Sequence, residues 1–365
     1  MPSPRSQIYY WKCDRPAALH SVGQDTATRE RPDLQPGLAA ALQRYFGAPA
    51  QDLRPAGGQG NHATFRATLG GRDSFIRVED GPERDDYFLV ESHVLRLVRE
   101  VGVLTPEVYG LDASRGTEPF AWQVLERVPH PDLNHWYKAG QLDLERTARQ
   151  IGAAVARWQA ITPAGFGPFR SDVVATSGQL LGHHARYADY FTLHLDRHLM
   201  FLVGRDFLSS DEATAIRSEI NDRRALLDLP SGCLVHKDLA LWNVLGTTTD
   251  VVSVIDWDDC IAGDPMDDLS LLGCFHDGPT LSATFAGYAS VRPLPSDYCP
   301  RFWLHLLRNM VMKAVIRVGA GYFDLGSNFF LVGPGGTGGD LKQFTLSRIR
   351  TALAGLRDSR DPTTL

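Results

Sequence analysis

One stretch of the sequence combines residues that could move a proton with residues that could bind a metal ion. His236, Asp238 and Asn243 form the pattern H-x-D-x-x-x-x-N, and Asp256 follows Asn243 by 13 residues at the end of an apolar run. A carboxylate can accept a proton from a hydroxyl group, and amide and carboxylate oxygens are suitable ligands for Mg²⁺. Three fixed residues recur by chance in about 5% of chains of this length, so the pattern indicates a catalytic loop.

The pattern resembles that of the aminoglycoside phosphotransferase and choline kinase families, which share the protein-kinase-like fold. The Gly-Asp-Pro-x-x-Asp-Leu signature of these families is also present, at residues 263–269. The resemblance extends over residues 45–330. It implies transfer of a phosphoryl group from ATP to a hydroxyl group, a reaction that depends mainly on positioning and charge neutralisation.

The resemblance assigns a role to each residue of the loop. Asp238 is the expected catalytic base, at the tip of a loop that follows a strand. Asn243 and Asp256 are the expected ligands of a Mg²⁺ ion that faces the β- and γ-phosphates. His236 belongs to the same catalytic group, and we expect it to brace the backbone of the loop rather than to react.

A glycine-rich turn is the first candidate for nucleotide binding. Residues 58–65 follow the pattern G-x-G-x-x-A-x-F, which is similar to the loop that covers phosphates in kinase-like folds, with Ala63 in place of the third glycine. Gly58, Gly60 and Asn61 are the expected nucleotide contacts. A plain turn is the alternative interpretation.

The phosphate-binding cation departs from the family pattern. The strand at residues 75–78 presents Arg77 where the family normally has a lysine, and no lysine occurs between positions 12 and 138. Arginine can hold phosphate oxygens through its planar fork, but its length and geometry differ from those of lysine. Glu91 is the expected partner of Arg77, with Glu83 or Asp85 as alternatives.

A further nucleotide contact is expected at the segment 123–128, which resembles the connection between the lobes of kinase-like folds. Backbone groups near Glu126 and Val128 are expected to hydrogen-bond adenine. Since backbone groups carry this role, the resemblance alone supports it.

The acceptor pocket is expected between Asp238 and the helices of the second lobe. Carboxylates there could bind a cationic acceptor through charge-assisted hydrogen bonds. The candidates are Asp259, Asp267 and Asp189, with Asp132 and Asp324 as further ones. A solvated surface position is the alternative for each, and Asp267 could instead cap a helix. Four tryptophans could stack on a ring, with core packing as the alternative: Trp136, Trp242, Trp257 and Trp303.

The surrounding elements predict an α+β, two-lobed, protein-kinase-like fold. Residues 1–36 form an extension whose aromatic cluster, at positions 8–11, is expected to dock on the body. Residues 37–126 predict a small lobe with about five antiparallel strands and one long helix. The small-lobe elements are expected at 38–46 (helix), 63–68, 74–78, 85–101 (helix), 108–111 and 120–125.

Residues 127–365 predict a mainly helical second lobe that contains the catalytic loop and the acceptor pocket. Its helices are expected at 142–161, 186–203, 211–227, 267–290, 299–319 and 340–357. Its short strands are expected at 233–235, 244–245 and 251–255. The segment Gly333 to Gly339 has five glycines and predicts a flexible loop.

Composition excludes several other classes. The net charge of −6 and the pI near 6.0 argue against a nucleic-acid binder. Five scattered cysteines form no disulfide framework or zinc pattern. Neither a signal peptide nor a membrane span is found, so a cytoplasmic protein is expected. The oligomeric state is left open.

The sequence therefore predicts a kinase that uses ATP and Mg²⁺ to phosphorylate a small molecule. An aminoglycoside-type antibiotic is the first choice of acceptor, with antibiotic resistance as the consequence. A metabolic kinase for a sugar, an amino alcohol or another natural product is the first alternative. A catalytically silent nucleotide-binding protein is the second, because Arg77 replaces the usual lysine. A protein kinase is disfavoured, since no A-P-E segment follows Asp256.

Overall fold

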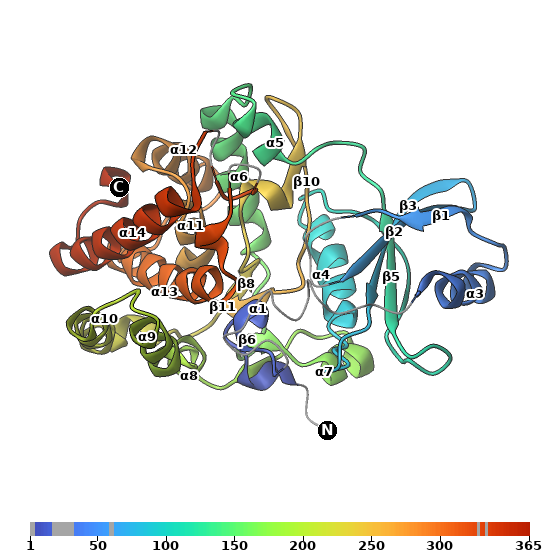
Figure 1. Cartoon of the computed structure of the whole chain (residues 1–365), viewed down its shortest axis with the longest axis horizontal. Coiled ribbons are helices and arrows are strands. Elements are labelled where there is room, and N and C mark those ends of the chain that lie inside the picture. The colour runs from blue at the N-terminus through green and yellow to red at the C-terminus, as the bar shows by residue number, and fades with distance from the viewer. Residues whose placement is uncertain (1–3, 17–32, 58–61, 327–328, 333–334) are drawn as a thin grey trace.

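The computed structural model of the chain describes residues 4–16, 33–57, 62–326, 329–332 and 335–365. A small lobe built on a sheet lies beside a larger, mainly helical lobe (Figure 1). The α+β class and the division into two lobes are confirmed.

The small lobe is one antiparallel sheet with the strand order β1-β2-β3-β5-β4. A turn at Gly70 and Gly71, both with positive φ, joins β2 to β3. Helix α3 packs beside the sheet, and its Leu38 and Leu42 are fully buried in the core of this lobe. The elements are α3 Gln35–Phe46, β1 Gln51–Pro55, β2 Ala63–Leu69, β3 Arg72–Glu79, α4 Phe88–Glu100, β4 Val108–Asp112 and β5 Ala121–Glu126.

The large lobe contains the expected helices, but two of them are divided. The helix predicted at 186–203 is interrupted before His194, whose φ of 55° is left-handed. The helix predicted at 267–290 ends at Gly273, and a new one begins at Gly278, where a Cβ atom would lie 2.0 Å from the Thr363 carbonyl oxygen. The helices are α5 Leu133–Lys138, α6 Leu144–Trp158, α7 Ser171–Ser177, α8 Tyr187–Phe191, α9 Leu195–Gly204, α10 Ser210–Asp222, α11 Met266–Gly273, α12 Gly278–Ala289, α13 Tyr298–Gly319 and α14 Gly338–Asp358.

Short strands frame the catalytic loop. The three predicted strands are present as β8 Cys233–Val235, β9 Val244–Gly246 and β10 Val251–Val254. Three more were not predicted: β6 Phe166–Phe169, β7 Gly182–His184 and β11 Ile261–Gly263. They join β8 in a sheet of order β7-β6-β11-β8, while β9 and β10 pair separately. The loop that holds the predicted catalytic residues thus runs from the end of β8 to the start of β9.

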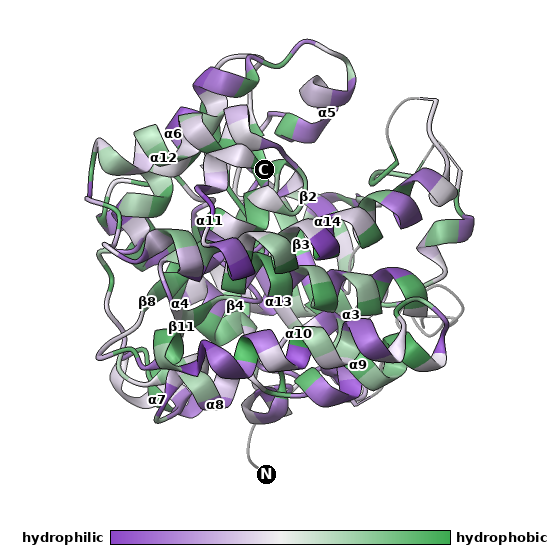
Figure 2. Cartoon of the chain, turned by 90° about the vertical axis from the view of Figure 1, so that its left-hand side faces the viewer, coloured by the Kyte–Doolittle hydropathy of each residue, from purple (hydrophilic) through white to green (hydrophobic). Residues whose placement is uncertain are grey.

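The core of the large lobe surrounds α13, which is buried along most of its length. Viewed from the helical end, α9, α10 and α14 show hydrophilic residues interspersed with hydrophobic ones, as expected of helices that cover a core (Figure 2). Helix α14 begins at Gly338, capped by Thr337, inside the segment expected to be a flexible loop, whose residues 333–334 lie outside the described ranges. Among the described helices, none has the length and apolar character needed to cross a bilayer.

The N-terminal residues dock between the lobes. A 3-10 helix, η1 Pro4–Gln7, and the short helix α1 Trp11–Asp14 lie against β6 and α13, away from α3 (Figure 1). Tyr9 stacks on Tyr190 with a centroid distance of 5.2 Å. Every member of the aromatic cluster at 8–11 is buried, so this segment is part of the folded body, as expected.

Candidate active site

The catalytic loop is held in shape by His236, which is fully buried. Its Nε2 lies 2.9 Å from the Ile255 carbonyl oxygen, and its Nδ1 accepts a hydrogen bond of 3.2 Å from the Asp238 backbone N–H. Both ring nitrogens therefore bind backbone, and Nε2 carries the proton. Lys237 adopts a left-handed φ of 72°, which turns the chain so that Asp238 faces the cleft. In this structure His236 positions the loop.

The Gly-Asp-Pro-x-x-Asp segment supports the loop from behind. The Asp268 carboxylate accepts hydrogen bonds from the backbone N–H groups of His236 and Lys237, at 3.0 and 3.1 Å. The Asp267 carboxylate binds Lys237 Nζ at 2.8 Å and Asn309 Nδ2 at 2.8 Å. Asp267 is fully buried and does not line the cleft. Its prediction as an acceptor ligand is corrected here, because an internal ion pair already uses its charge.

The two predicted metal ligands face the same cavity. Asn243 Nδ2 donates hydrogen bonds to Asp238 at its backbone oxygen (2.7 Å) and at Oδ2 (3.1 Å), which leaves the amide oxygen of Asn243 for another partner. The backbone carbonyl oxygen of Asn243 accepts a 3.0 Å hydrogen bond from the backbone N–H of Ile255, the residue before Asp256. Asp238, Asn243 and Asp256 all line the cleft. An amide oxygen beside carboxylates is a donor set that suits Mg²⁺.

The Asp256 carboxylate lies in a crowded acidic environment. Its backbone has a left-handed φ of 65°, an arrangement often found at functional sites. Although 42% of its side chain is exposed to the cleft, enclosure by the protein and the neighbouring Asp258 carboxylate raise the pKa of Asp256 to about 7. A bound cation would favour its ionised form.

Arg77 joins the small lobe to this acidic group. Its Nη1 lies 2.6 Å from both carboxylate oxygens of Glu91, the partner expected from the sequence. Its Nη2 lies 3.0 Å from Asp256 Oδ1 and 3.1 Å from Asp258 Oδ2. Glu91 is fully buried and also accepts a bond from the Trp257 N–H. The guanidinium fork thus contacts three carboxylates at once.

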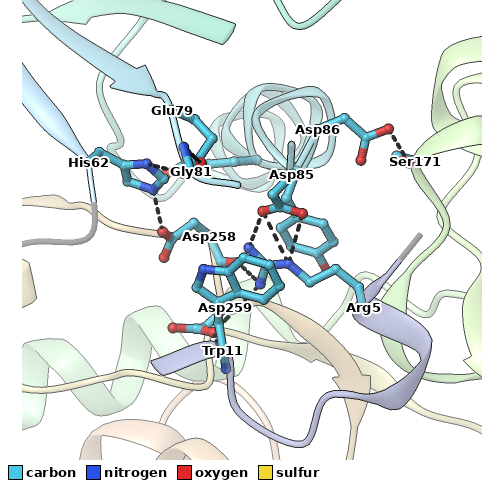
Figure 3. Close-up of polar contacts among 12 residues, drawn as sticks. Arg5, Trp11, His62, Glu79, Gly81, Asp85, Asp86, Ser171, Asp258 and Asp259 are labelled. Atoms are coloured by element: carbon cyan, nitrogen blue, oxygen red, sulfur yellow. Dashed lines mark hydrogen bonds and ion pairs between the residues drawn. The ribbon is translucent and has the colours of Figure 1, made fainter. Parts of the chain in front are cut away.

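His62 forms a second link between the lobes, which the sequence did not indicate. Its Nδ1 lies 3.0 Å from Glu79 Oε2 and its Nε2 lies 3.0 Å from Asp258 Oδ2 (Figure 3). Burial alone would lower the pKa of His62, but the bonds to Asp258 and Glu79 outweigh burial and raise it to about 9. His62 is therefore a cation at neutral pH.

The cleft between the lobes has a volume of about 820 Å³. Arg77 and Glu91 line its small-lobe side, and Glu126 and Val128 line the connection between the lobes. Gly57 also lines it, whereas Gly58, Gly60 and Asn61 lie outside the described residues. The cleft therefore contains the described nucleotide-binding candidates and the three catalytic-loop candidates.

The remaining acceptor candidates differ in position. Asp259 lines the cleft, where its Oδ1 accepts a 3.3 Å bond from the Trp11 N–H and lies 3.7 Å from Arg5 Nη1. Asp189 does not line the cleft and pairs with the exposed Arg186 at 2.7 Å, so its prediction as an acceptor ligand is corrected. Asp132 lines the cleft but caps α5.

Of the four tryptophans considered, one lines the cleft. Trp242 does so, whereas Trp257 and Trp303 are buried in the core and Trp136 donates its indole N–H to the Gly246 carbonyl oxygen. Core packing, the alternative interpretation, therefore applies to Trp257 and Trp303.

The N-terminal segment forms part of the cleft wall. Tyr10 and Lys12 line the cleft, and the Tyr10 hydroxyl interacts with the Asp238 carboxylate. Burial, together with nearby carboxylates, raises the pKa of Tyr10 well above its ordinary value. The sequence predicted that this segment docks, but its composition alone could not show that it reaches Asp238.

Arg5 anchors the same segment (Figure 3). Its guanidinium lies between the rings of Trp11 and Tyr87, 4.1 Å from each centroid. Its Nη2 is 2.6 Å from Asp85 Oδ2, and its Nη1 donates to the Asp258 carbonyl oxygen at 2.9 Å. The first residues of the chain thereby bind both the small lobe and the segment that follows Asp256.

A lysine also approaches the predicted base. Lys313, on α13, places Nζ 3.7 Å from Asp238 Oδ1 and is largely buried. The separation of 75 positions in sequence gave no local signal for this contact. Asp238 therefore has a tyrosine hydroxyl and an ammonium group as neighbours.

Residues 52–298 match the sequence profile of the phosphotransferase enzyme family. No curated protein matches the sequence. A thermostable mutant of aminoglycoside phosphotransferase APH(4)-Ia has a similar structure, with 19% identity, a TM-score of 0.61 and coverage of 87% of this chain and 98% of that one. Another mutant of that enzyme was solved in a ternary complex with ADP and hygromycin B.

A macrolide 2'-phosphotransferase from Brachybacterium faecium is also similar, with 14% identity, a TM-score of 0.54 and coverage of 90% of this chain and 100% of that one. At such low identities these likenesses establish the fold. The predicted protein-kinase-like fold is confirmed.

Proposed function

Because the chain belongs to the phosphotransferase enzyme family, we propose that it transfers the γ-phosphoryl group of ATP to a hydroxyl group of a small molecule. The observation that carries this proposal is that Asp238, Asn243 and Asp256 line the same cleft as the Arg77–Glu91 pair. A proton acceptor, metal-binding oxygens and a phosphate-binding cation thus meet in one cavity, which is what phosphoryl transfer requires.

In this proposal Asp238 orients the acceptor hydroxyl and accepts its proton. The hydroxyl oxygen forms a bond to the γ-phosphorus while the bond to the ADP oxygen breaks. Asn243 holds the Asp238 carboxylate in place through the 3.1 Å bond to Oδ2. Mg²⁺, when bound, would be held by Asn243 and Asp256 and would neutralise charge on the β- and γ-phosphates.

Arg77 has two tasks in the proposed mechanism. Its Nη1 is fixed by Glu91, which orients the guanidinium. Its Nη2 is available to a phosphate oxygen once the nucleotide competes with Asp256 and Asp258 for it. Adenine would bind the backbone between Glu126 and Val128, at the end of the cleft where the lobes join.

The charges on the acceptor side bear on the substrate class. An aminoglycoside would require free carboxylates, but Asp259 is engaged by the Trp11 N–H and by Arg5, and Asp132 caps a helix. Lys12 lines the cleft and Lys313 lies beside Asp238. These cations would repel a polycationic acceptor. We therefore favour the alternative of a natural product other than an aminoglycoside.

The function is tested by ADP release from ATP in the presence of a broad panel of hydroxylated small molecules. Acceptor-dependent release is expected for wild type and for Asp189→Asn, which removes a surface carboxylate, and is expected to be lost in Asp238→Asn. Release that persists in Asp238→Asn would contradict the assigned base. Expression in a sensitive host tests whether the acceptor is an antibiotic. Resistance to an aminoglycoside that is lost when Asp238 is replaced would show that an aminoglycoside is the acceptor.

One observation favours a catalytically silent nucleotide-binding protein. The Arg77 guanidinium binds Asp256, a proposed metal ligand, at 3.0 Å. If this ion pair persisted in the presence of nucleotide, Asp256 would be withheld from the metal. ATP binding measured by calorimetry, combined with no ADP release for any acceptor, would establish this alternative.

A further inference from the structure

A second cavity of about 550 Å³ adjoins the catalytic cleft. The two cavities share the lining residues Asn134, Trp242 and Phe330, so they lie next to each other. Trp242 packs edge-on against Phe275, which lines the second cavity, with a centroid distance of 4.7 Å, and against the shared Phe330, at 5.3 Å. Such a wall suits a flat, apolar body.

Arg317 lines this second cavity and carries an unbalanced charge. Its side chain is only 2% exposed, and its Nη1 donates to the Thr345 hydroxyl at 2.7 Å. Across the described part of the chain, no carboxylate lies within ion-pair distance of it. Burial lowers the pKa of Arg317 to about 10, so it remains a cation at neutral pH. A buried charge without a counter-ion is costly unless a ligand supplies one.

Lys313 lies one helical turn before Arg317 on α13, about 6 Å along the axis. Its Nζ lies 3.7 Å from Asp238 Oδ1 and 4.9 Å from the centroid of the Phe275 ring. One face of α13 thus runs from the proposed base to the unbalanced guanidinium. An acceptor that spans this distance has its hydroxyl group at one end and its charge at the other.

Three lysines lie at or near the two cavities. The chain has five lysines and 32 arginines. Lys12 lines the catalytic cleft, Lys138 lines the second cavity, and Lys313 contacts Asp238. The acidic residue that lines the second cavity, Asp340, is already used to cap α14. The second cavity is thus lined by two cations, Lys138 and Arg317, together with aromatic rings.

We propose that the acceptor is a hydroxylated aromatic acid, whose anionic group binds Arg317 while its ring packs on Trp242 and Phe275 and its hydroxyl meets Asp238. The contact between the acceptor hydroxyl and Asp238 rests on the proposed function, whereas the anion site depends on Arg317 alone. The acceptor is thus opposite in charge to an aminoglycoside.

The anion site is tested by fluorescence titration of the full chain with 8-anilinonaphthalene-1-sulfonate and with its uncharged counterpart N-phenyl-1-naphthylamine. Arg317→Met is expected to weaken binding of the sulfonate ~10- to 100-fold and to leave binding of the neutral dye unchanged. Arg317→Lys, which keeps the charge, is expected to bind the sulfonate more tightly than Arg317→Met does. Lys342→Met, which removes an exposed surface cation, is expected to bind both dyes as wild type does. Equal binding of the sulfonate by wild type and Arg317→Met would overturn the site.

A second measurement uses the unmodified protein and so does not depend on the folding of a variant. Displacement of the bound sulfonate is measured with 4-(hydroxymethyl)benzoate and with its methyl ester, which differ in charge. The acid is expected to displace the dye at a concentration at least tenfold lower than the ester. Equal displacement by both would contradict binding through the anionic group.

ADP release separates the two proposals. If aromatic hydroxy acids support release and their methyl esters do not, both proposals hold. If esters support release as well as acids do, the function stands and the anionic acceptor is overturned. If no acceptor gives Asp238-dependent release while Arg317-dependent dye binding persists, the function fails and the anion site stands.

Discussion

The guanidinium of Arg77, on β3 of the small lobe, pairs with the Asp256 carboxylate of the large lobe, with Nη2 3.0 Å from Oδ1. The same side chain holds Glu91 through Nη1. A lysine has a single ammonium nitrogen, so it could not place two separate nitrogens on Glu91 and Asp256 as the guanidinium fork does. The replacement of the family's lysine by arginine therefore couples the phosphate-binding position directly to a proposed metal ligand.

Removing this cation is expected to affect activity and stability separately. Arg77→Met should reduce kcat/KM for ATP at least ~100-fold and should destabilise the fold by about 3–5 kcal/mol, because Glu91 is left buried without a counter-charge. The double variant Arg77→Met/Glu91→Gln should recover much of the stability and none of the activity. Urea unfolding and ADP release measure the two effects; recovery of activity in the double variant would contradict the role of Arg77.

Replacing the proposed base tests the chemistry directly. Asp238→Asn should lower kcat by ~10²- to 10⁴-fold, because the acceptor proton loses its carboxylate. ATP affinity should remain within a few-fold, since Asn243 and Asp256 are unchanged. Single-turnover kinetics measure the rate of phosphoryl transfer, and calorimetry measures the affinity for ATP. An equal loss of rate and of affinity would indicate that Asp238 has a structural role instead.

The His62 link predicts a pH dependence of stability. The pKa of His62 is raised from 6.5 to about 9 in the folded protein, so its contribution is fully present below pH 6.5 and is lost as the pH rises through 9. The contribution is roughly 3 kcal/mol. Between pH 6 and 9.5, the free energy of unfolding should fall more in wild type than in His62→Gln. Parallel pH profiles for the two proteins would exclude a charged His62.

The N-terminal segment is predicted to affect the acceptor and not the nucleotide. Tyr10→Phe removes the hydroxyl that interacts with Asp238 and should change acceptor KM or kcat by about three- to tenfold, the effect of one modest hydrogen bond. The KM for ATP should not change. Tyr45→Phe, at an exposed position, is the matched control. A Tyr10→Phe enzyme with an altered KM for ATP alone would contradict this placement.

The parts of the fold that could be predicted are those set by local pattern. The spacing of His236, Asp238 and Asn243 located the loop that holds the proposed catalytic residues, and apolar periodicity located α4, α6, α13 and α14. The pairing of Arg77 with Glu91 followed from a strand and a helix that adjoin in sequence. In each case the partners are close in sequence or belong to one motif.

The parts that could not be predicted depend on long-range contacts. Lys313 reaches Asp238 from a helix 75 positions away, and the breaks at His194 and Gly278 arise from left-handed backbone and from close approach to Thr363. Asp267 was predicted to face the acceptor because a carboxylate near Asp238 could bind a cationic acceptor through charge-assisted hydrogen bonds. It is buried because Lys237, in the adjacent loop, supplies its counter-charge.

The position of Arg5 has a consequence for motion. Its guanidinium contacts Asp85 in the small lobe and the carbonyl of Asp258 in the large lobe, while Trp11 and Tyr87 enclose it. A hinge rotation that swings the lobes apart would have to expose this buried ion pair to water. Opening of the cleft is therefore opposed by the cost of breaking this contact, so the first residues of the chain restrain the relative motion of the two lobes.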